Sequence, residues 1–171
     1  VKQKHLVPCL LNKLIELFHS TQIFEYLEDA YPEPPLWPQD VATRANARQL
    51  ELMADEVYFA NVIPLFSLQN DRDCEVAQAS YAKMHRYHRE MEKRLENQPF
   101  LVGQFSYADI AFFMAQLFAD RMGCPLTDET PKLVDWRNRM AARESVQDTL
   151  KPMQAYLQSV SRYFPGWVYS E

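Results

Sequence analysis

The fold class is indicated most clearly by the stretch SYADIAFFMAQLFA, residues 106–119. Its first four residues have the pattern of a capping box, in which the Ser106 hydroxyl accepts from the Asp109 amide and the Asp109 carboxylate accepts from the Ser106 amide. Only Asp109 and Gln116 are strongly polar after that first serine, and a helix that is apolar all round is buried all round. We therefore expect a helical bundle built around this helix, in which Ser106 and Asp109 stabilise the fold and touch no substrate.

Apolar side chains at helical spacing continue on both sides of this central helix. The predicted helices cover residues 43–63, 74–97, 107–119, 131–142 and 146–164. The buried face of the first should carry Leu50, Met53, Ala54 and Val57. Pro64 should kink or end that helix, and Pro152 should kink the last one. Thr130-Pro131 is typical of a helix start, and residues 145–148 resemble a second capping box.

The first 38 residues have a different pattern. Two short apolar stretches flank Asn12 and predict a two-stranded hairpin within His5 to Phe18. Pro8 cannot donate to a strand ladder and so belongs at the start or the edge of the first strand. Ser20 is a favourable N-cap for the helix that follows. The buried side of that helix should carry Ile23, Leu27 and Ala30.

A proline-rich segment separates this part from the helices. The helix after Ser20 should stop by Tyr31, because a residue that precedes a proline is pushed out of helical geometry. The segment YPEPPLWP, residues 31–38, has four prolines in its last seven residues and is expected to be a stiff, extended linker. The predicted fold class is α+β to mainly α. Residues 1–38 form a strand-strand-helix piece with its linker, and residues 39–171 form an all-α domain.

Composition excludes several classes of protein. The net charge is −5 and no basic face is visible, which argues against nucleic-acid binding. No apolar run approaches the roughly 18 residues of a membrane span, and the amino-terminal stretch is not expected to be a signal peptide. Three widely spaced cysteines fit reduced thiols in the cytoplasm better than a disulfide framework.

Several motifs occur in a characteristic order along the chain. They are Leu6-Val7-Pro8, His19-Ser20 with the helix residues 23–28, the linker 31–38, Arg44-Ala45, and Phe100-Leu101-Val102-Gly103 with Ser106-Tyr107-Ala108-Asp109. Together they resemble the cytosolic glutathione S-transferase family, of bacterial type, over essentially the whole chain. The resemblance implies the trailing half of a thioredoxin-like glutathione-binding domain, followed by the all-α carboxyl-terminal domain of the family.

The resemblance assigns glutathione-binding roles to four residues of the first part. The backbone of Val7, before a family proline that is cis and matches Pro8, would pair with the cysteinyl part of glutathione like an added strand. Ser20, at a helix N-terminus, would hold the γ-glutamyl carboxylate. From the residues alone, a helix cap is the better explanation for Ser20, and only the resemblance favours both roles together. His19 stands where the family commonly has Glu or Gln, so its contact with the ligand would differ.

The chain begins after the point where the first strand, helix and second strand of the family should lie. We therefore expect the Tyr, Ser or Cys that activates the glutathione thiol to lie upstream of Val1, and we assign no catalytic residue in this chain. The implied function is conjugation of glutathione to hydrophobic electrophiles by a homodimer. A non-catalytic dimerisation or assembly module is the alternative, as is a glutathione-dependent peroxidase or ether-cleaving enzyme.

The aromatic residues Tyr58, Phe59, Tyr163 and Trp167 could line the pocket for the hydrophobic substrate. Core packing explains these aromatic side chains equally well. Asp55, on the same predicted helix as Tyr58, is interpreted as a solvated carboxylate, with contact to the glutathione amine across a dimer as the alternative.

A metal site is the remaining possibility in the sequence. His85 and His88 are spaced i,i+3 on one helix, with Glu92 one turn further on. Nothing else in the sequence marks a metal site, so we interpret the two histidines as surface or interface residues and expect no metal. The three cysteines are not expected to be nucleophiles. Cys9 should be a buried strand residue, whereas Cys74 and Cys124 lie near helix ends.

Overall fold

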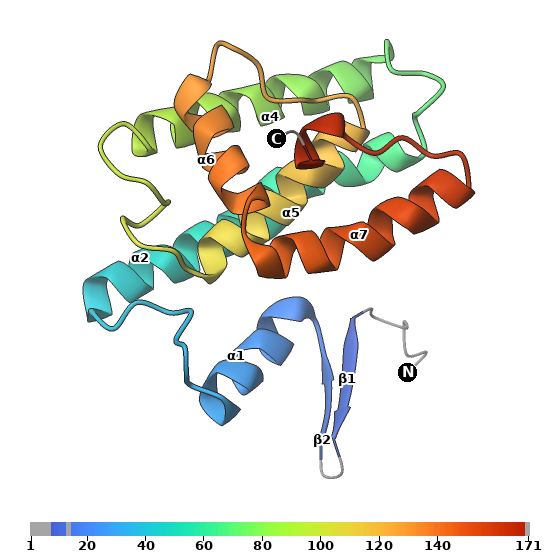
Figure 1. Cartoon of the computed structure of the whole chain (residues 1–171). Helices are drawn as coiled ribbons and strands as arrows, with labels where there is room; N and C mark the ends of the chain where they lie inside the picture. Colours follow the sequence, from blue (N-terminus) through green and yellow to red (C-terminus); the bar gives the residue numbers. More distant parts are fainter. Residues whose placement is uncertain (1–7, 13–14, 170–171) are drawn as a thin grey trace.

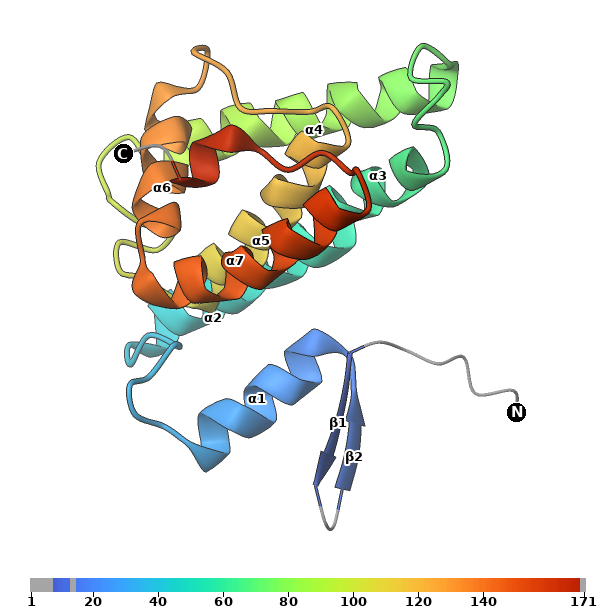
Figure 2. The same ribbon diagram turned by 45° about the vertical axis from the view of Figure 1, so that its right-hand side comes forward.

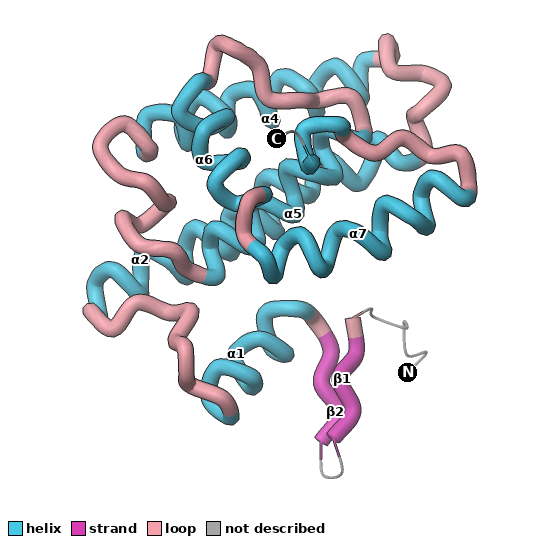
Figure 3. The backbone as a smooth tube through the Cα atoms, viewed as in Figure 1, coloured by secondary structure: helices cyan, strands magenta, loops and turns pink. Residues whose placement is uncertain are grey.

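The computed structural model describes residues 8–12 and 15–169. A hairpin and one helix form the amino-terminal part, which lies on one side of a bundle formed by the remaining helices (Figures 1 and 2). Figure 3 shows that the described part of the chain is mostly helical. The predicted fold class, two strands and a helix followed by an all-α bundle, is confirmed. No helix among the described residues is both long enough and apolar enough to span a bilayer.

The hairpin pairs β1 (Cys9–Asn12) with β2 (Ile15–Phe18) in antiparallel fashion, and Cys9 lies opposite Phe18. Pro8 precedes β1, as predicted, and Val7 lies outside the described residues. Cys9 is exposed, so the expectation that it is buried was wrong. The reason is that a two-stranded hairpin covers neither of its own faces.

Helix α1 spans Ser20–Ala30 and ends at Tyr31, as predicted. Its N-cap is His19, with a φ of 70°, and not Ser20, which is the first helical residue. The predicted buried side was also wrong, because Leu27 is 38% exposed and Ala30 is exposed. The helix packs against the bundle through a different face, on which Phe24 is buried.

One long helical rod follows the linker. It consists of α2 (Val41–Leu52), the π-helical segment η1 (Met53–Phe59), α3 (Ala60–Val62) and the 3₁₀ turn η2 (Ile63–Phe66). The turn at η2 contains Pro64, which ends the helix as predicted. Within η1 the wider π turns shift the side chains relative to α-helical spacing. Tyr58 therefore takes the buried position predicted for Val57, which is 49% exposed.

Helix α5 (Tyr107–Arg121) runs through the middle of the bundle, with α2, α4 (Glu75–Arg94), α6 (Pro131–Ala141) and α7 (Glu144–Ser159) around it (Figure 1). None of its residues is exposed. The predicted capping box is present, and the buried Asp109 also accepts from the Leu101 amide at 3.0 Å and from Trp136 Nε1 at 2.9 Å. This carboxylate therefore joins the loop before α5 to α6.

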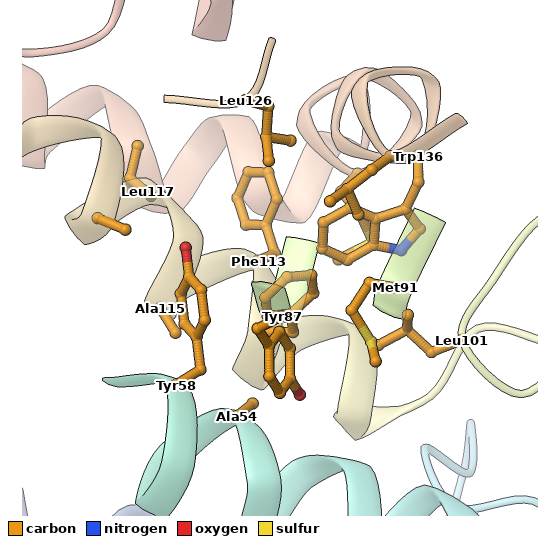
Figure 4. Close-up of a cluster of buried hydrophobic side chains, with 14 of the residues drawn as sticks. Ala54, Tyr58, Tyr87, Met91, Leu101, Phe113, Ala115, Leu117, Leu126 and Trp136 are labelled. Carbon is orange, nitrogen blue, oxygen red and sulfur yellow. The ribbon is translucent and has the colours of Figure 1, made fainter. Parts of the chain in front are cut away.

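Aromatic rings fill the core between these helices (Figure 4). Phe112 of α5 contacts Tyr58, Tyr87 and Trp136, with ring centroids 5.2 Å apart in each pair. The core thus joins η1, α4, α5 and α6 around a single ring.

The last two helices confirm one predicted start and contradict the other. Helix α6 begins at Pro131 after the N-cap Thr130, as predicted. The second capping box is not formed, because α7 already begins at Glu144 after Arg143 and no side chain caps it. Pro152 lies inside α7, which runs on to Ser159 and is followed by the 3₁₀ turn η3 (Gly166–Tyr169).

Candidate functional site

A cavity of about 220 Å³ lies where α1, the α2–η1 rod and α5 meet. Its lining residues are Ser20, Glu51, Ala54, Asp55, Phe59, Tyr107, Ile110, Ala111, Met114, Ala115 and Phe118. Nearly all of the α5 residues on this list are only partly buried, whereas most of the other residues of α5 are fully buried. The cavity is therefore the place where the central helix lacks full cover.

One end of the cavity is polar. The Thr21 hydroxyl donates to Glu51 Oε1 at 2.6 Å, which holds the carboxylate near the start of α1. Burial, more than the neighbouring Glu51 charge, raises the pKa of Tyr107 to about 12, although a hydrogen bond with Ser20 opposes the rise. Burial also raises the pKa of Glu51, against the effect of the Thr21 bond. At neutral pH Tyr107 is therefore an intact phenol that can donate or accept a hydrogen bond.

An aromatic cluster positions Tyr107 at this end. The Tyr107 ring stacks on Phe24 with centroids 3.6 Å apart, and Trp37 meets both rings edge-on at 5.7 and 5.1 Å. The Tyr107 amide donates to the Leu36 carbonyl at 3.0 Å. Glu28 of α1 accepts from the amides of Leu36 and Trp37 at 2.9 and 2.8 Å. These contacts fix the linker and the second half of α1 beside the start of α5.

The other end of the cavity is apolar. Phe59 and Phe118 meet edge-on with centroids 5.9 Å apart, and Met114 lies one turn of α5 before Phe118. The α2–η1 rod forms one wall of the cavity with Glu51, Asp55 and Phe59, which are spaced about one turn apart. This wall therefore changes from acidic to aromatic along the rod. The cavity can hold a molecule that is polar at one end and hydrophobic at the other.

The start of α1 has the properties of an anion site. Ser20 is the first residue of this 11-residue helix, and the amides of a first helical turn have no partner within the helix. These amides and the helix dipole favour a carboxylate. Of the other residues predicted to bind glutathione, Pro8 and His19 are both exposed.

The predicted pocket aromatics do not all meet at the cavity. Only Phe59 lines it. Tyr58 is 1% exposed in the core, where its hydroxyl lies 2.6 Å from His88 Nε2. Tyr163 and Trp167 lie instead beside the buried Asp120, to which their hydroxyl and indole N–H donate at 3.4 and 2.7 Å.

Sequence reasoning missed Glu51, Tyr107 and Met114 at the cavity. The signal for Glu51 was available, because it is spaced i,i+4 from Asp55 on a helix that also carries Leu50 and Ala54. Two acidic residues one turn apart beside an apolar face fit a polar cavity wall, although a solvated helix face has the same pattern. For Tyr107 and Met114 no local signal exists, since the central helix is apolar on every face.

The sequence of this region decides the family. Residues 54–144, more than half of the chain, match the profile of the glutathione S-transferase C-terminal domain. The chain belongs to the glutathione S-transferase family. A match of this extent confirms the family that the motif order indicated.

Individual members of the glutathione S-transferase family are similar to this chain at low sequence identity. Glutathione S-transferase theta-1 of Gallus gallus is 26% identical over 148 residues, which cover 78% of this chain and 56% of the relative. The chain thus spans little more than half the length of that relative.

Solved glutathione S-transferases show the same fold. The enzyme of Rhodospirillum rubrum is 25% identical with a TM-score of 0.75, over 85% of this chain and 70% of the other. A Methylobacillus flagellatus transferase with glutathione bound is 27% identical with a TM-score of 0.67, over 78% of this chain and 69% of the other.

Proposed function

We propose that the protein containing this chain is a glutathione transferase that conjugates glutathione to hydrophobic electrophiles. In that reaction the glutathione sulfur, as a thiolate, forms a bond to an electrophilic carbon, and the leaving group departs with its electron pair. The observation that carries the proposal is the cavity that joins the start of α1 to the apolar wall of Phe59 and Phe118. Family membership supports the same reaction.

The polar end of the cavity is the proposed site for glutathione. Ser20 and the first amides of α1 would hold the γ-glutamyl carboxylate. The carboxylates of Glu51 and Asp55 line the same cavity and would attract the γ-glutamyl ammonium group. Val7, Pro8 and His19 remain proposed contacts for the rest of the tripeptide. In this arrangement the γ-glutamyl carboxylate and the γ-glutamyl ammonium group of glutathione contact different groups of the cavity.

The apolar end is the proposed site for the second substrate. Phe59, Met114 and Phe118 offer flat and flexible apolar surface of the kind that binds aromatic or alkyl groups. The cavity is small, so we expect compact electrophiles. We propose that the residue that activates the thiol lies upstream of Val1, and the residues of this chain then bind and orient the two substrates.

The test uses the full-length protein. We expect retention on immobilised glutathione and conjugation of a chlorinated aromatic compound. The change Ser20→Ala should weaken glutathione binding about tenfold, because one hydrogen bond to a charged group is lost. Ser159→Ala, at the exposed end of α7, is the matched control and should bind normally.

The outcomes separate the candidate functions. A protein that neither binds glutathione nor conjugates the compound contradicts the proposal and favours a non-catalytic assembly module. Binding accompanied by peroxide reduction or ether cleavage, without conjugation, favours the related glutathione chemistries. Unchanged affinity in Ser20→Ala leaves Ser20 with a structural role only.

The domain boundaries also remain a proposal. We propose that residues 1–38 are the trailing half of a thioredoxin-like domain with its linker, and that residues 39–171 are the all-α domain. The non-helical segment from Tyr31 to Pro38 supports this division. The proposed cytoplasmic location is supported by three free thiols, which suit a reducing compartment.

A further inference from the structure

Two histidines and a cysteine meet on the side of the bundle formed by α4 and the loop after α5. One ring nitrogen each of His85 and His88 and the Cys124 sulfur lie within 4.8 Å of one another. His85 Nε2 is 3.9 Å from Cys124 Sγ. His85 is exposed, whereas His88 is 2% exposed and Cys124 is fully buried. The expectation that both histidines are surface or interface residues was therefore wrong for His88, which is buried in the core of this chain.

The backbone places Cys124 firmly. Helix α5 ends in a Schellman motif, in which the Cys124 amide donates to the Ala119 carbonyl and the Gly123 amide donates to the Asp120 carbonyl, both at 2.9 Å. Gly123 has a φ of +97°, a conformation that glycine adopts without strain. The turn directs the chain back, so that Cys124 is buried beside α4.

His88 is positioned by its own partner. Tyr58 Oη lies 2.6 Å from His88 Nε2 in the core. Zinc binding through Nδ1 requires the tautomer in which Nε2 carries the proton and donates to Tyr58. Histidines that bind metals commonly hold their second nitrogen in such a bond, which fixes the tautomer and the ring orientation.

We propose that His85, His88 and Cys124 bind a zinc ion that ties α4 to the loop after α5. Two imidazoles and one thiolate are a typical zinc donor set, and a water molecule can supply the fourth ligand. Zinc bonds of about 2.0–2.3 Å place tetrahedral ligand atoms roughly 3.3–3.8 Å apart. Zinc binding requires the present separation of up to 4.8 Å to shorten to these distances, and the exposed His85 has room to move.

A surface depression borders the proposed site at His85. It is about 560 Å³ in volume and is lined by Ala82, His85, Arg89, Thr127, Asp128 and Glu129. The carboxylates of Asp128 and Glu129 attract a cation, while Arg89 opposes it. Glu92, the third ligand considered from the sequence, is engaged elsewhere, because it accepts from the amides of Lys132 and Leu133 at the start of α6.

Core packing alone does not account for this arrangement. A buried histidine needs a partner, and Tyr58 satisfies that need for His88. The i,i+3 spacing on α4 brings His85 beside His88, but neither that spacing nor the Tyr58 bond gives a reason for the Cys124 thiol to reach the same point from the loop after α5. The zinc proposal does not depend on glutathione binding, since none of its three ligands lines the cavity at Ser20.

Cobalt(II) is the spectroscopic probe for such a site. The protein for this test carries Cys9→Ser and Cys74→Ser, so that Cys124 is the only thiol left within residues 1–171, and any cysteine outside these residues is likewise changed to serine. We expect one equivalent of cobalt to produce thiolate-to-metal charge-transfer absorption and the intense visible bands of a tetrahedral ion, and zinc to abolish both. Absence of the charge-transfer band, or its persistence after Cys124→Ser, would overturn the proposal.

Zinc affinity measured by chelator competition gives a second test. His85→Ala should weaken binding by about 100-fold or more, since even outer partners of metal ligands contribute 10–100-fold. His85 is exposed, so this variant should fold. Arg86→Ala, the exposed neighbour on the same helix, is the matched control and should bind zinc normally. Equal zinc affinity in His85→Ala and the parent protein rules out the site.

Discussion

At the scale of single residues, Asp109 shows how a sequence motif acquires a further role in the folded chain. The capping box accounts for its bond to the Ser106 amide, at 3.0 Å. The bonds from Leu101 and from the Trp136 indole come from parts of the chain that the motif does not include. One buried carboxylate thus satisfies donors from α5, its preceding loop and α6.

Replacing Asp109 with Ala should destabilise the fold strongly. Four donors would lose a charged acceptor in a buried place, and we expect a loss of about 3 kcal/mol or more in the free energy of unfolding. Urea unfolding followed by circular dichroism measures it. Asp148→Ala removes an exposed carboxylate from α7 and should change stability by less than about 0.5 kcal/mol. A cost below about 1 kcal/mol for Asp109→Ala would contradict this role.

Glu51 should make stability depend on pH. Burial raises its pKa in the folded state above the ordinary value of 4.5, so the folded protein holds this proton more tightly than the unfolded chain does. This contribution to stability is complete below pH 4.5 and is lost as the pH rises through the folded-state pKa. Unfolding free energies measured across this range should therefore decline with pH less steeply in Glu51→Gln.

The neighbouring threonine provides the matched comparison. The Thr21 hydroxyl bond lowers the pKa of Glu51, so Thr21→Val should raise it further and steepen the decline of stability with pH. Identical pH profiles in the parent protein and Glu51→Gln would show that this carboxylate does not contribute.

At the scale of elements, α1 and the linker depend on each other. The linker has few backbone partners of its own, and the Glu28 carboxylate of α1 accepts from the amides of Leu36 and Trp37. Glu25 adds bonds to Trp37 Nε1 at 3.1 Å and to Arg48 at 3.2 Å. Side chains of α1 thus hold the segment that joins it to α2.

Glu28→Ala should loosen this joint without unfolding the bundle. Loss of a charged acceptor for two amides should cost about 2 kcal/mol locally. We expect faster amide hydrogen exchange in α1 and in residues 31–38, with unchanged exchange in α5. Asp29→Ala, the exposed neighbour, is the control. Equal acceleration in α1 and α5 would mean that Glu28 supports the whole fold and not the joint.

At the scale of the whole molecule, the amino-terminal part and the bundle meet through few side chains. The rings of Phe24, Trp37 and Tyr107 form an aromatic contact between the two parts, and the cavity lies beside these rings. A site formed at such a junction depends on how two parts of the chain are held together. The family resemblance adds the expectation that two copies associate.

We expect the full-length protein to sediment as a homodimer. Leu52 and Val57 leave about half of their side-chain surface exposed on the α2–η1 rod, and burying such apolar surface favours association. Leu52→Glu should shift the equilibrium toward monomer. Val76→Glu places the same charge at an exposed valine of α4 and is the control. A parent protein that sediments as a monomer at all concentrations contradicts the expectation.

Local patterns predicted most of the elements. The hairpin, the end of α1 at Tyr31, the linker, and the starts of α5 and α6 all depend on interactions within a few residues. The predictions failed where a distant contact or a shift of helical register determines which side chains are buried. The side of α1 that is buried depends on where the bundle lies, and the exchange of Val57 for Tyr58 depends on a π turn that has no clear sequence signature.

The sequence by itself determined that this chain is a helical bundle around residues 107–121, preceded by a short β–β–α piece, because periodicity and capping are local properties. Only the tertiary structure decided which residues meet. It brought Ser20, Glu51 and Tyr107 to one cavity, and it brought His85, His88 and Cys124 together between α4 and the loop after α5. The physical reason is that packing of whole faces, set by the burial of side chains distant in sequence, chooses among positions that local rules leave equivalent.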